Sequence, residues 1–280
     1  MEFLSGTYFK HKCHWQFTDY SDERNCQFTS KEDFNIDNDY VFCKTEYLQT
    51  LAQYVSNHVI RLPHQFKLFT HNSDINIDDK AIDVVLNWFP NMGHWYTQNL
   101  LVQHDKVSPI PIGLANPKWS HGNVDRFNKI INEIHEKSNL VYVNFNVNTN
   151  PQARNYCLQQ IDHVVNTKYP NWTSISDHNS FVDSTQNDYL RDIKKSYFVV
   201  SPDGNGKDCH KTWESIYMGS IPIVTDSYFA RRFKQLGIPI YIIDDWNQFS
   251  SLNLSTELYY SIWNNFDIKE LNLEMFLNDA

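Results

Sequence analysis

Short apolar runs alternate along the chain with stretches in which apolar residues recur every three or four positions. The short runs predict buried strands at 66–69, 107–112, 140–143, 172–176, 197–200, 221–224 and 239–243. The helix-spaced stretches predict helices at 45–57, 79–88, 125–137, 151–166, 185–195, 208–218, 228–236 and 255–276. Because strands separated by helices favour parallel sheets covered on both faces, the pattern predicts an α/β protein.

These elements divide into two α/β halves. No linker rich in Pro, Gly or Ser separates the halves. We expect the boundary between them to lie within 122–139. The predicted organisation is an N-terminal domain at 1–135, a C-terminal domain at 136–254 and a closing helical segment at 255–280. A chain of 280 residues is long enough for two domains of ordinary size.

The segment 201–226 contains the densest group of candidate functional residues. A predicted strand is followed there by a glycine-bearing turn, a helix and a second strand, which together make a βαβ unit. Backbone N–H groups at the start of such a helix bind anions, and the helix dipole favours negative charge there. The segment therefore predicts a phosphate site, although glycines also serve in ordinary turns.

The helix predicted at 208–218 has one apolar face and one polar face. The apolar face carries Cys209, Trp213, Ile216 and Tyr217, and the polar face carries Lys207, His210, Lys211 and Glu214. A bound phosphate would meet Lys211 together with the glycine turn, and Glu214 could accept hydrogen bonds from ribose hydroxyls. The same pattern also fits a helix whose charged side chains are simply solvated.

The same segment resembles the C-terminal signature of the exostosin-like glycosyltransferases. The matching positions are Ser201, Pro202, Gly204, Asn205, Gly206, Asp208, Lys211, Thr212, Trp213, Glu214, Gly219, Ile221, Pro222, Ile223 and Val224. The family usually carries arginine where this chain has Lys211. Lysine keeps the positive charge but loses the bidentate geometry with which arginine pairs with a diphosphate.

Two further blocks resemble the small members of this family from algae and large DNA viruses. Residues 70–74, Thr-His-Asn-Ser-Asp, follow a predicted strand as in those enzymes, and residues 106–119 contain the element IPIGL-x-N-x-x-W. The resemblance spans roughly residues 40–250, whereas the first forty residues match nothing in the family.

The resemblance implies a GT-B architecture, in which two Rossmann-like domains face a central cleft. It implies an inverting glycosyltransferase that moves a sugar from a UDP-sugar to a hydroxyl of a glycan acceptor. UDP-xylose is the donor that the family suggests, and pentose and hexose transfer are both compatible with the residues. The C-terminal domain would bind the nucleotide sugar, the N-terminal domain would bind the acceptor, and segment 255–280 would pack back on the N-terminal domain.

By this resemblance the donor site is formed by the βαβ segment and the helix that follows it. The expected donor-binding residues are Ser201, Gly204, Asn205, Gly206, Asp208, His210, Lys211, Trp213, Glu214 and Arg231. Lys211 and the amides of Asn205 and Gly206 would stabilise the departing diphosphate, while Glu214 would bind the ribose. For Arg231 a solvated helix face explains the sequence equally well.

Inversion requires a base that takes the proton of the acceptor hydroxyl, and the resemblance places this base in the N-terminal domain. Asp74 and His71 follow a predicted strand and are the leading candidates. For the acceptor site the candidates are Asn72, His94 and Trp95.

Simpler explanations of these residues remain open. The stretch 71–74 could only cap the next helix or shape a turn. The rings of His94 and Trp95 could belong to a packed core. The base could instead be Asp19, Asp22, His94 or Asp105.

Charge and metal-ligand spacing narrow the function classes. The formal net charge of −9 argues against nucleic acid as the main partner but leaves room for a nucleotide in one local basic pocket. No metal cofactor is expected to be obligatory. Asp37-Asn38-Asp39 and Asp244-Asp245 leave a Mg²⁺- or Mn²⁺-dependent D-x-D glycosyltransferase as an alternative, and a non-catalytic nucleotide-sugar or carbohydrate-binding module is another.

The sequence also bears on where the protein is located. No window approaches 18 uninterrupted apolar residues, and the N-terminus lacks the features of a signal peptide. The five cysteines form no C-x-x-C pair and fit reduced thiols. These features predict a soluble cytoplasmic protein with no membrane span.

Overall fold

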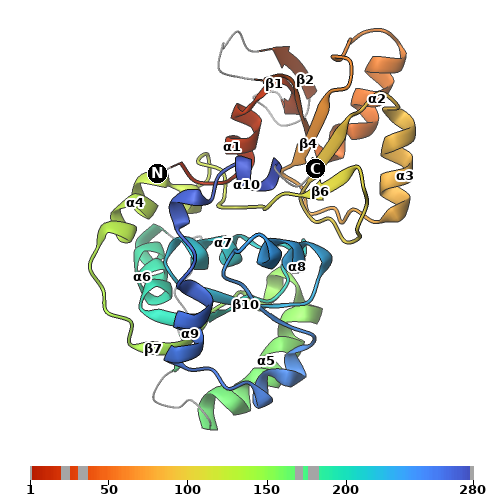
Figure 1. Cartoon of the computed structure of the whole chain (residues 1–280). Coiled ribbons are helices and arrows are strands. Elements are labelled where there is room, and N and C mark those ends of the chain that lie inside the picture. Colours follow the sequence, from red (N-terminus) through yellow and green to blue (C-terminus); the bar gives the residue numbers. More distant parts are fainter. Residues whose placement is uncertain (1, 20–25, 31–36, 168–172, 176–182, 278–280) are drawn as a thin grey trace. The chain divides into compact units, whose positions relative to one another are not determined.

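The structure is a computed structural model that describes residues 2–19, 26–30, 37–167, 173–175 and 183–277. The chain divides into two compact units (Figure 1). The N-terminal unit comprises Glu2–Ile112 together with Asn272–Ala280, and the C-terminal unit comprises Gly113–Leu271. Each unit is an α/β structure built on one sheet, which confirms the fold class expected from the alternation of strands and helices.

In the described part of the N-terminal unit, six strands form one mixed sheet in the order β2-β1-β3-β4-β5-β6. The strands are β1 (Cys13–Asp19), β2 (Cys26–Ser30), β3 (Asp37–Lys44), β4 (Lys67–His71), β5 (His94–Thr97) and β6 (Val107–Pro109). The helices are α1 (Gly6–His11), α2 (Leu48–Ser56), α3 (Asp79–Trp88) and α10 (Glu274–Leu277). Only the β1–β2 pair among these neighbours is antiparallel, so β1 and β3 to β6 share one carboxyl edge.

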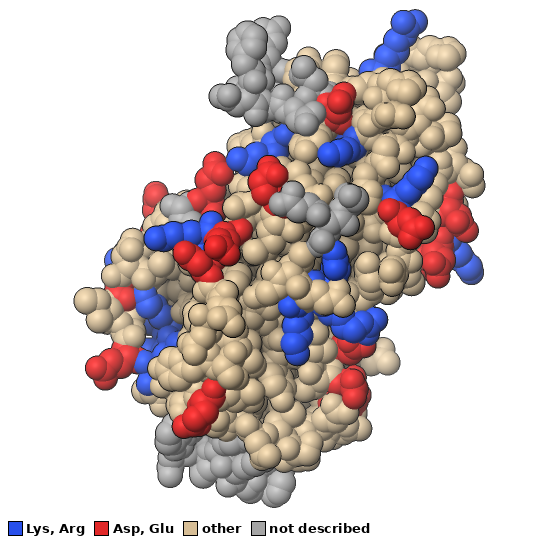
Figure 2. Space-filling model, viewed as in Figure 1, with Lys and Arg blue, Asp and Glu red and all other residues tan. Residues whose placement is uncertain are grey.

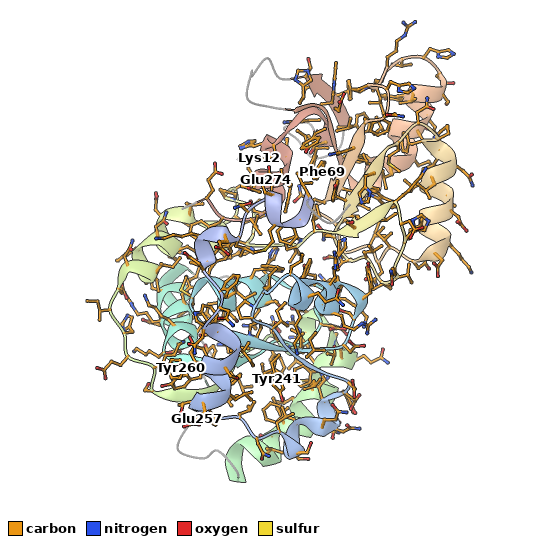
Figure 3. All side chains as sticks on the ribbon, in the orientation of Figure 1. Lys12, Phe69, Tyr241, Glu257, Tyr260 and Glu274 are labelled. Carbon is orange, nitrogen blue, oxygen red and sulfur yellow. The ribbon has the colours of Figure 1, made fainter. Side chains whose placement is uncertain are left out.

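The N-terminal sheet is held by aromatic packing between neighbouring strands. Phe69 of β4, labelled in Figure 3, stacks on Tyr96 of β5 with ring centroids 4.8 Å apart, and both side chains are fully buried. Trp95 Nε1 donates a 2.8 Å hydrogen bond to Thr70 Oγ1, which satisfies the one polar atom of that buried ring. The apolar run at 66–69 therefore forms a central strand, as its pattern predicts.

In the described part of the C-terminal unit, five parallel strands form a sheet in the order β11-β10-β9-β7-β8. The strands are β7 (Asn139–Val143), β8 (Thr173–Ile175), β9 (Ser196–Val200), β10 (Ile221–Thr225) and β11 (Tyr241–Ile243). The helices are α4 (Val124–Asn132), α5 (Pro151–Thr167), α6 (Asp183–Lys194), α7 (His210–Tyr217), α8 (Tyr228–Gln235) and α9 (Thr256–Trp263).

The strands of the C-terminal sheet consist mainly of apolar residues, which the covering helices bury. Phe198 of β9 meets Tyr241 of β11, labelled in Figure 3, edge to face with ring centroids 6.2 Å apart. Phe198 also meets Tyr259 of α9 edge to face at 6.3 Å. Tyr259 also donates a 2.7 Å hydrogen bond from its hydroxyl to Gly219 O, which ties α9 to the end of α7. Continuous apolar strands of this kind are typical of buried parallel sheets.

The closing segment differs from the single helical stretch expected at 255–276. It contains α9, a 3₁₀ turn at Ile268–Glu270 and α10. The helix stops at Trp263 because Asn264, Asn265 and Asp267 follow, and such side chains compete with helical hydrogen bonds. Asn272–Ala280 groups with the N-terminal unit, where Leu273 N donates to the Tyr8 hydroxyl at 3.0 Å, whereas α9 belongs to the C-terminal unit.

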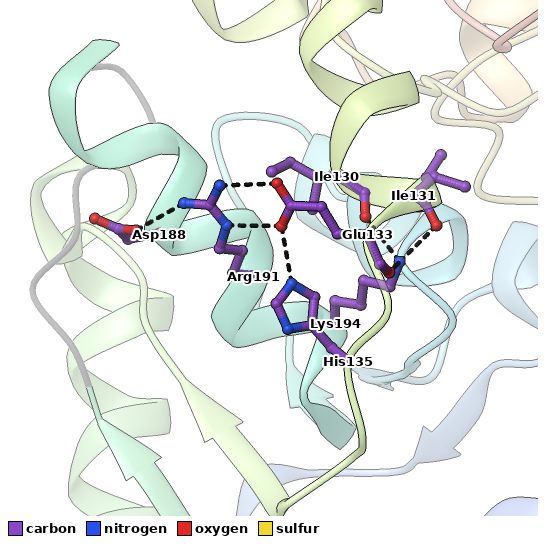
Figure 4. A network of polar contacts seen from close by, with 7 residues as sticks. All are labelled: Ile130, Ile131, Glu133, His135, Asp188, Arg191 and Lys194. Atoms are coloured by element: carbon purple, nitrogen blue, oxygen red, sulfur yellow. Dashed lines mark hydrogen bonds and ion pairs between the residues drawn. The ribbon is translucent and has the colours of Figure 1, made fainter.

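The two units divide after Ile112, earlier than the boundary expected at 135, because α4 is fastened to α6 (Figure 4). Arg191 Nε and Nη2 each donate a 2.8 Å hydrogen bond to the carboxylate of Glu133. Lys194 Nζ donates to the carbonyl oxygens of Ile130, Ile131 and Glu133 at 2.5–2.7 Å, and so satisfies the last turn of α4. Because contacts between residues far apart in the sequence set the division between the two units, the local amino-acid composition does not reveal it.

Glu133→Gln is expected to lower the free energy of unfolding by about 2 kcal/mol at pH 7. The hydrogen bond from Arg191, followed by that from His135, holds the pKa of Glu133 at about 2. A depressed carboxyl pKa contributes stability above about pH 4.5 that is lost as the pH falls toward 2. Urea unfolding should therefore show a difference at pH 7 that shrinks below pH 4.5. The exposed Glu136→Gln is the control, and equal losses in both variants would contradict the account.

Candidate functional site

The candidate site lies at the carboxyl edge of the C-terminal sheet. β7, β9 and β10 end there, and the turn Ser201–Gly206 leads from β9 to the start of α7. Ligands of open parallel α/β sheets settle beyond the carboxyl ends of the strands. The topology thus places the turn where the sequence predicts an anion site.

The glycine turn is supported from below by the start of α5. Asn150 Nδ2 donates a 2.7 Å hydrogen bond to Gly204 O, and Arg154 Nε donates at 2.9 Å to Asp203 O. Arg154 Nη1 donates at 2.7 Å to Asn146 O, which lies in the loop after β7. The Arg154 side chain is buried, with 8% of its surface exposed, so it brings a positive charge beneath the turn.

A larger residue at position 204 would be tightly packed. A Cβ atom added to Gly204 would lie 3.1 Å from Cys209 Sγ and 3.3 Å from Arg154 Nη2. Gly204 N also donates a 3.0 Å hydrogen bond to Gly206 O, which closes the turn on itself. A larger residue here would therefore require Cys209 or Arg154 to shift by a few tenths of an ångström.

A chain of three polar side chains lies beside the turn. Lys211 Nζ donates a 2.7 Å hydrogen bond to the Tyr189 hydroxyl, and this hydroxyl donates at 2.6 Å to Glu214 Oε2. The lysine nitrogen also lies 4.4 Å from the centroid of the Tyr189 ring. Burial lowers the pKa of Lys211 to about 8, against the opposing effect of the Glu214 carboxylate. Tyr189, on α6, thus fixes both charged groups of α7.

Glu214 is almost completely buried, with 4% of its surface exposed. Its Oε2 accepts the Tyr189 hydroxyl, whereas no donor within the described ranges reaches Oε1. An ionised carboxylate in such surroundings requires hydrogen-bond donors. Oε1 therefore keeps its capacity to accept a hydrogen bond.

Other residues expected to bind the donor have structural contacts. Ser201 Oγ lies 3.0 Å from Thr212 Oγ1 and joins the end of β9 to α7. The buried Asp208 accepts a 2.9 Å hydrogen bond from Trp213 Nε1 through its Oδ1, and Trp213 itself is fully buried. These contacts shape the turn and the helix start.

The remaining expected donor residues lie nearer the surface. Asn205 is exposed at the tip of the turn, and Arg231 is exposed on α8, where it pairs with Asp226. His210 is half-buried, and its Nδ1 lies 2.8 Å from Gly113 O. The structure thus brings His210, Lys211 and Glu214 together near the turn and leaves Arg231 in a surface ion pair.

In the N-terminal unit, His71 ends β4 at the carboxyl edge with both ring nitrogens engaged. Asn72 N donates to His71 Nδ1 at 2.7 Å, so the proton is assigned to Nε2, which donates to Pro111 O at 3.0 Å. Asn72 adopts a left-handed conformation, with φ of 62°. A Cβ atom on Gly6 would lie 2.8 Å from His71 Nδ1, which shows how closely α1 covers the ring.

Asp74 is exposed in the loop after β4. It does not cap the following helix, because Asp78 Oδ1 accepts the capping hydrogen bond from Ala81 N at 2.9 Å. The loop is anchored at Ser73, whose carbonyl oxygen accepts hydrogen bonds from Gln98 Nε2 and Asn99 Nδ2. The carboxylate of Asp74 is thus presented to solvent by a fastened loop.

His94 and Trp95 lie at the other end of the sheet from Asn72. His94 pairs in register with Lys67, the first residue of β4, so it is displaced from His71 by four residues, or about 13 Å along the strand. Trp95 is fully buried, and His94 Nε2 lies 2.9 Å from Ser108 Oγ. The structure therefore does not bring these two rings to the edge that carries Asn72.

The pKa of His94 predicts a pH-dependent stability. Burial, reinforced by Lys67 and His104, lowers this pKa to about 4. Between about pH 6.5 and pH 4 the unfolded chain binds a proton at His94 and the folded chain does not. The free energy of unfolding therefore falls as the pH decreases through this range, by up to about 3 kcal/mol.

Urea unfolding at pH 7 and pH 4.5 measures this loss. His94→Gln should lose much less stability between the two pH values than the wild type, whereas the exposed His64→Gln should behave like the wild type. Parallel pH dependence in His94→Gln and the wild type would contradict the assignment.

Arg154 and Tyr189 were not identified from the sequence. Asn150 and Arg154 are four residues apart at the start of a predicted helix, so they share a face, and this spacing is the signal that the sequence offered. Nothing local marks Tyr189, because its role depends on the packing of α6 against α7.

The described part of the chain contains neither a metal-binding cluster nor a membrane-spanning helix. Within the described ranges, no three His, Cys, Asp or Glu side chains are grouped so as to hold a metal ion. In the Asp37-Asn38-Asp39 motif, the side chains of the first two residues lie outside the described set. In the Asp244-Asp245 pair, Asp245 Oδ1 accepts hydrogen bonds from Tyr156 and Asn247. None of the helices described here is long and apolar enough to cross a bilayer.

The charged side chains are mixed in sign. On the face shown in Figure 2, lysines and arginines are interspersed with aspartates and glutamates, with no extended basic area. Comparison of the chain with protein-family models gave no match, and comparison with curated protein sequences gave none either.

Proposed function

We propose that the chain is an inverting glycosyltransferase that transfers a sugar from a UDP-sugar to a hydroxyl group of a glycan. In this proposal the two units are the two Rossmann-like domains of a GT-B enzyme. The observation that carries the proposal is the Lys211–Tyr189–Glu214 chain, which lies beside a glycine turn at the carboxyl edge of a parallel sheet. UDP-xylose is the first donor to test.

A half-buried lysine and a buried arginine favour a diphosphate at this turn. Lys211 uses one of its three N–H donors on Tyr189, so two remain for phosphate oxygens. Arg154 donates from Nε and Nη1 to backbone carbonyls, and it therefore contributes its charge and the position of the turn. Both charges lie in surroundings of low dielectric, where their attraction for an anion is stronger than in water.

The carboxylate of Glu214 suits the ribose of a nucleotide. Tyr189 orients Oε2, and Oε1 can accept hydrogen bonds from vicinal hydroxyls of the sugar. Lys211 and Glu214 are three residues apart on one helix, so phosphate and ribose can be held by adjacent positions of the same helix face. A nucleoside diphosphate presents these two groups in the same order.

The proposed reaction is a single displacement at the anomeric carbon. The carboxylate of Asp74 takes the proton of the acceptor hydroxyl, and the oxygen attacks C1 of the sugar from the face opposite UDP. The bond between C1 and the diphosphate oxygen breaks, and UDP leaves with the electron pair and is stabilised by Lys211 and the turn. Asp74 is preferred to His71 as the base because both ring nitrogens of His71 are engaged.

Release of UDP from a panel of UDP-sugars, with and without saccharide acceptors, tests the proposal. We expect saturable UDP release with at least one donor, stimulated by an acceptor and retained in EDTA. Saturable UDP binding without any release would instead indicate a non-catalytic nucleotide-sugar-binding module, and loss of release in EDTA would indicate the metal-dependent alternative.

A further inference from the structure

An exposed tryptophan lies near the candidate donor site. Half of the Trp119 surface is open to solvent, in contrast to the fully buried Trp95 and Trp213. Its ring is stacked near that of His121, with centroids 6.4 Å apart and planes inclined by 20°. The His121 ring in turn lies 6.5 Å from that of His210, the residue before Lys211. A row of rings therefore leads from the proposed diphosphate site to an exposed indole.

The turn that carries Trp119 is rigidly held. Trp119 N donates to Asn116 O, and Gly122 N donates to Trp119 O, each at 2.9 Å. A Cβ atom at Gly122 would lie 2.3 Å from Asn116 O, so this tight turn requires glycine. Gln186 Nε2 donates at 2.9 Å to His121 O and fastens the turn to α6. A turn whose backbone is held in this way loses little conformational freedom when a ligand binds to it.

The chemistry of this surface suits a neutral pyranose ring. The face of an indole is electron-rich and attracts the C–H groups that line one face of a pyranose. Lys118 Nζ lies 5.0 Å from the Trp119 ring centroid, and Arg126 Nη1 donates to Ser120 O, so a cationic ligand would be repelled. Lys118 is exposed, and such a contact is weak enough to be displaced by a sugar.

We infer that Trp119 is the stacking platform for a pyranose ring of the acceptor saccharide. This inference rests on the proposed function. A sugar attached to a diphosphate at Lys211 would lie against His210 and His121, and the ring next to it, which belongs to the acceptor, would reach Trp119. Burial lowers the pKa of His121, which favours a neutral imidazole able to donate and accept hydrogen bonds with sugar hydroxyls.

Saturation-transfer NMR with methyl β-pyranosides of xylose, glucose, galactose and fucose tests this inference. We expect at least one to bind the wild-type protein through the C–H protons of one ring face. Trp119→Ala should weaken that binding about tenfold, and Trp119→Phe should retain most of it. Trp88→Ala, which removes an exposed tryptophan of α3, is the matched control and should bind as the wild type does.

Calorimetric titrations with UDP and UDP-xylose separate this inference from the proposed function. Trp119→Ala should leave both affinities unchanged. No pyranoside binding to a wild-type sample that binds UDP would overturn the inference alone, as would equal losses in Trp119→Ala and Trp88→Ala. A selective loss of UDP-xylose over UDP affinity in Trp119→Ala would also overturn it, because Trp119 would then contact the donor sugar. Failure of the wild type to bind UDP would count against the proposed function itself.

Discussion

Lys211→Met is expected to weaken UDP binding by about 2 kcal/mol at pH 7, or roughly thirtyfold. Methionine keeps the length of the side chain but removes the charge and the N–H donors that phosphate oxygens would accept. Calorimetric titration measures the change. Lys234→Met, which removes an exposed lysine near the end of α8, is the matched control and should bind UDP as the wild type does.

The pH dependence of the same titration adds a second criterion. Because burial lowers the pKa of Lys211 to about 8, UDP affinity of the wild type should fall as the pH rises through 8. The protonated form binds the anion, so each further pH unit weakens binding by up to about tenfold. Lys211→Arg remains charged and should bind equally at pH 7 and pH 9. A steep loss in both proteins would exclude Lys211 as the titrating group.

Asp74→Asn is expected to reduce kcat by roughly a thousandfold and to leave UDP affinity unchanged. Asparagine has nearly the same shape as aspartate, but its amide cannot take the proton of an acceptor hydroxyl. The exposed side chain has no capping role, so the substitution should not alter folding. Initial rates of UDP release at saturating donor and acceptor measure the effect.

Asp79→Asn is the control for this experiment, because it removes a neighbouring exposed carboxylate from the first turn of α3. It should keep a near-normal rate. If Asp74→Asn also retains such a rate, the base lies elsewhere in the chain. A parallel loss of UDP binding in Asp74→Asn would indicate a folding defect.

The strands and helices with strong periodicity could be predicted from the sequence. The helix at Asp79–Trp88 has the bounds that its apolar spacing predicts, and in the structure Asp78 caps its start. The βαβ segment also follows its pattern, because glycine and apolar runs mark both ends of α7. The first strands of the N-terminal unit were not predicted. β1 has the sequence CHWQFTD, in which apolar Cys13, Trp15 and Phe17 alternate with polar residues, so a short strand pattern is present there and was overlooked.

The chemistry of the candidate site was harder to predict than its position. The sequence placed Glu214 on the polar face of α7 and therefore near solvent, but packing against Tyr189 buries it. His94 and Trp95 suggested a sugar-stacking pair, whereas pairing of β4 with β5 places them at the amino end of the sheet. In both cases a partner distant in the chain determines what the side chain can contact, and one-dimensional periodicity carries no such information.

A calorimetric titration of the wild-type protein with UDP at pH 7 tests the central claim most directly. The site has the half-buried Lys211 and the buried Arg154 beside a glycine turn, and a carboxylate that can accept ribose hydroxyls. These features predict saturable one-to-one binding with a dissociation constant on the order of micromolar. Absence of saturable binding up to millimolar UDP would contradict the claim.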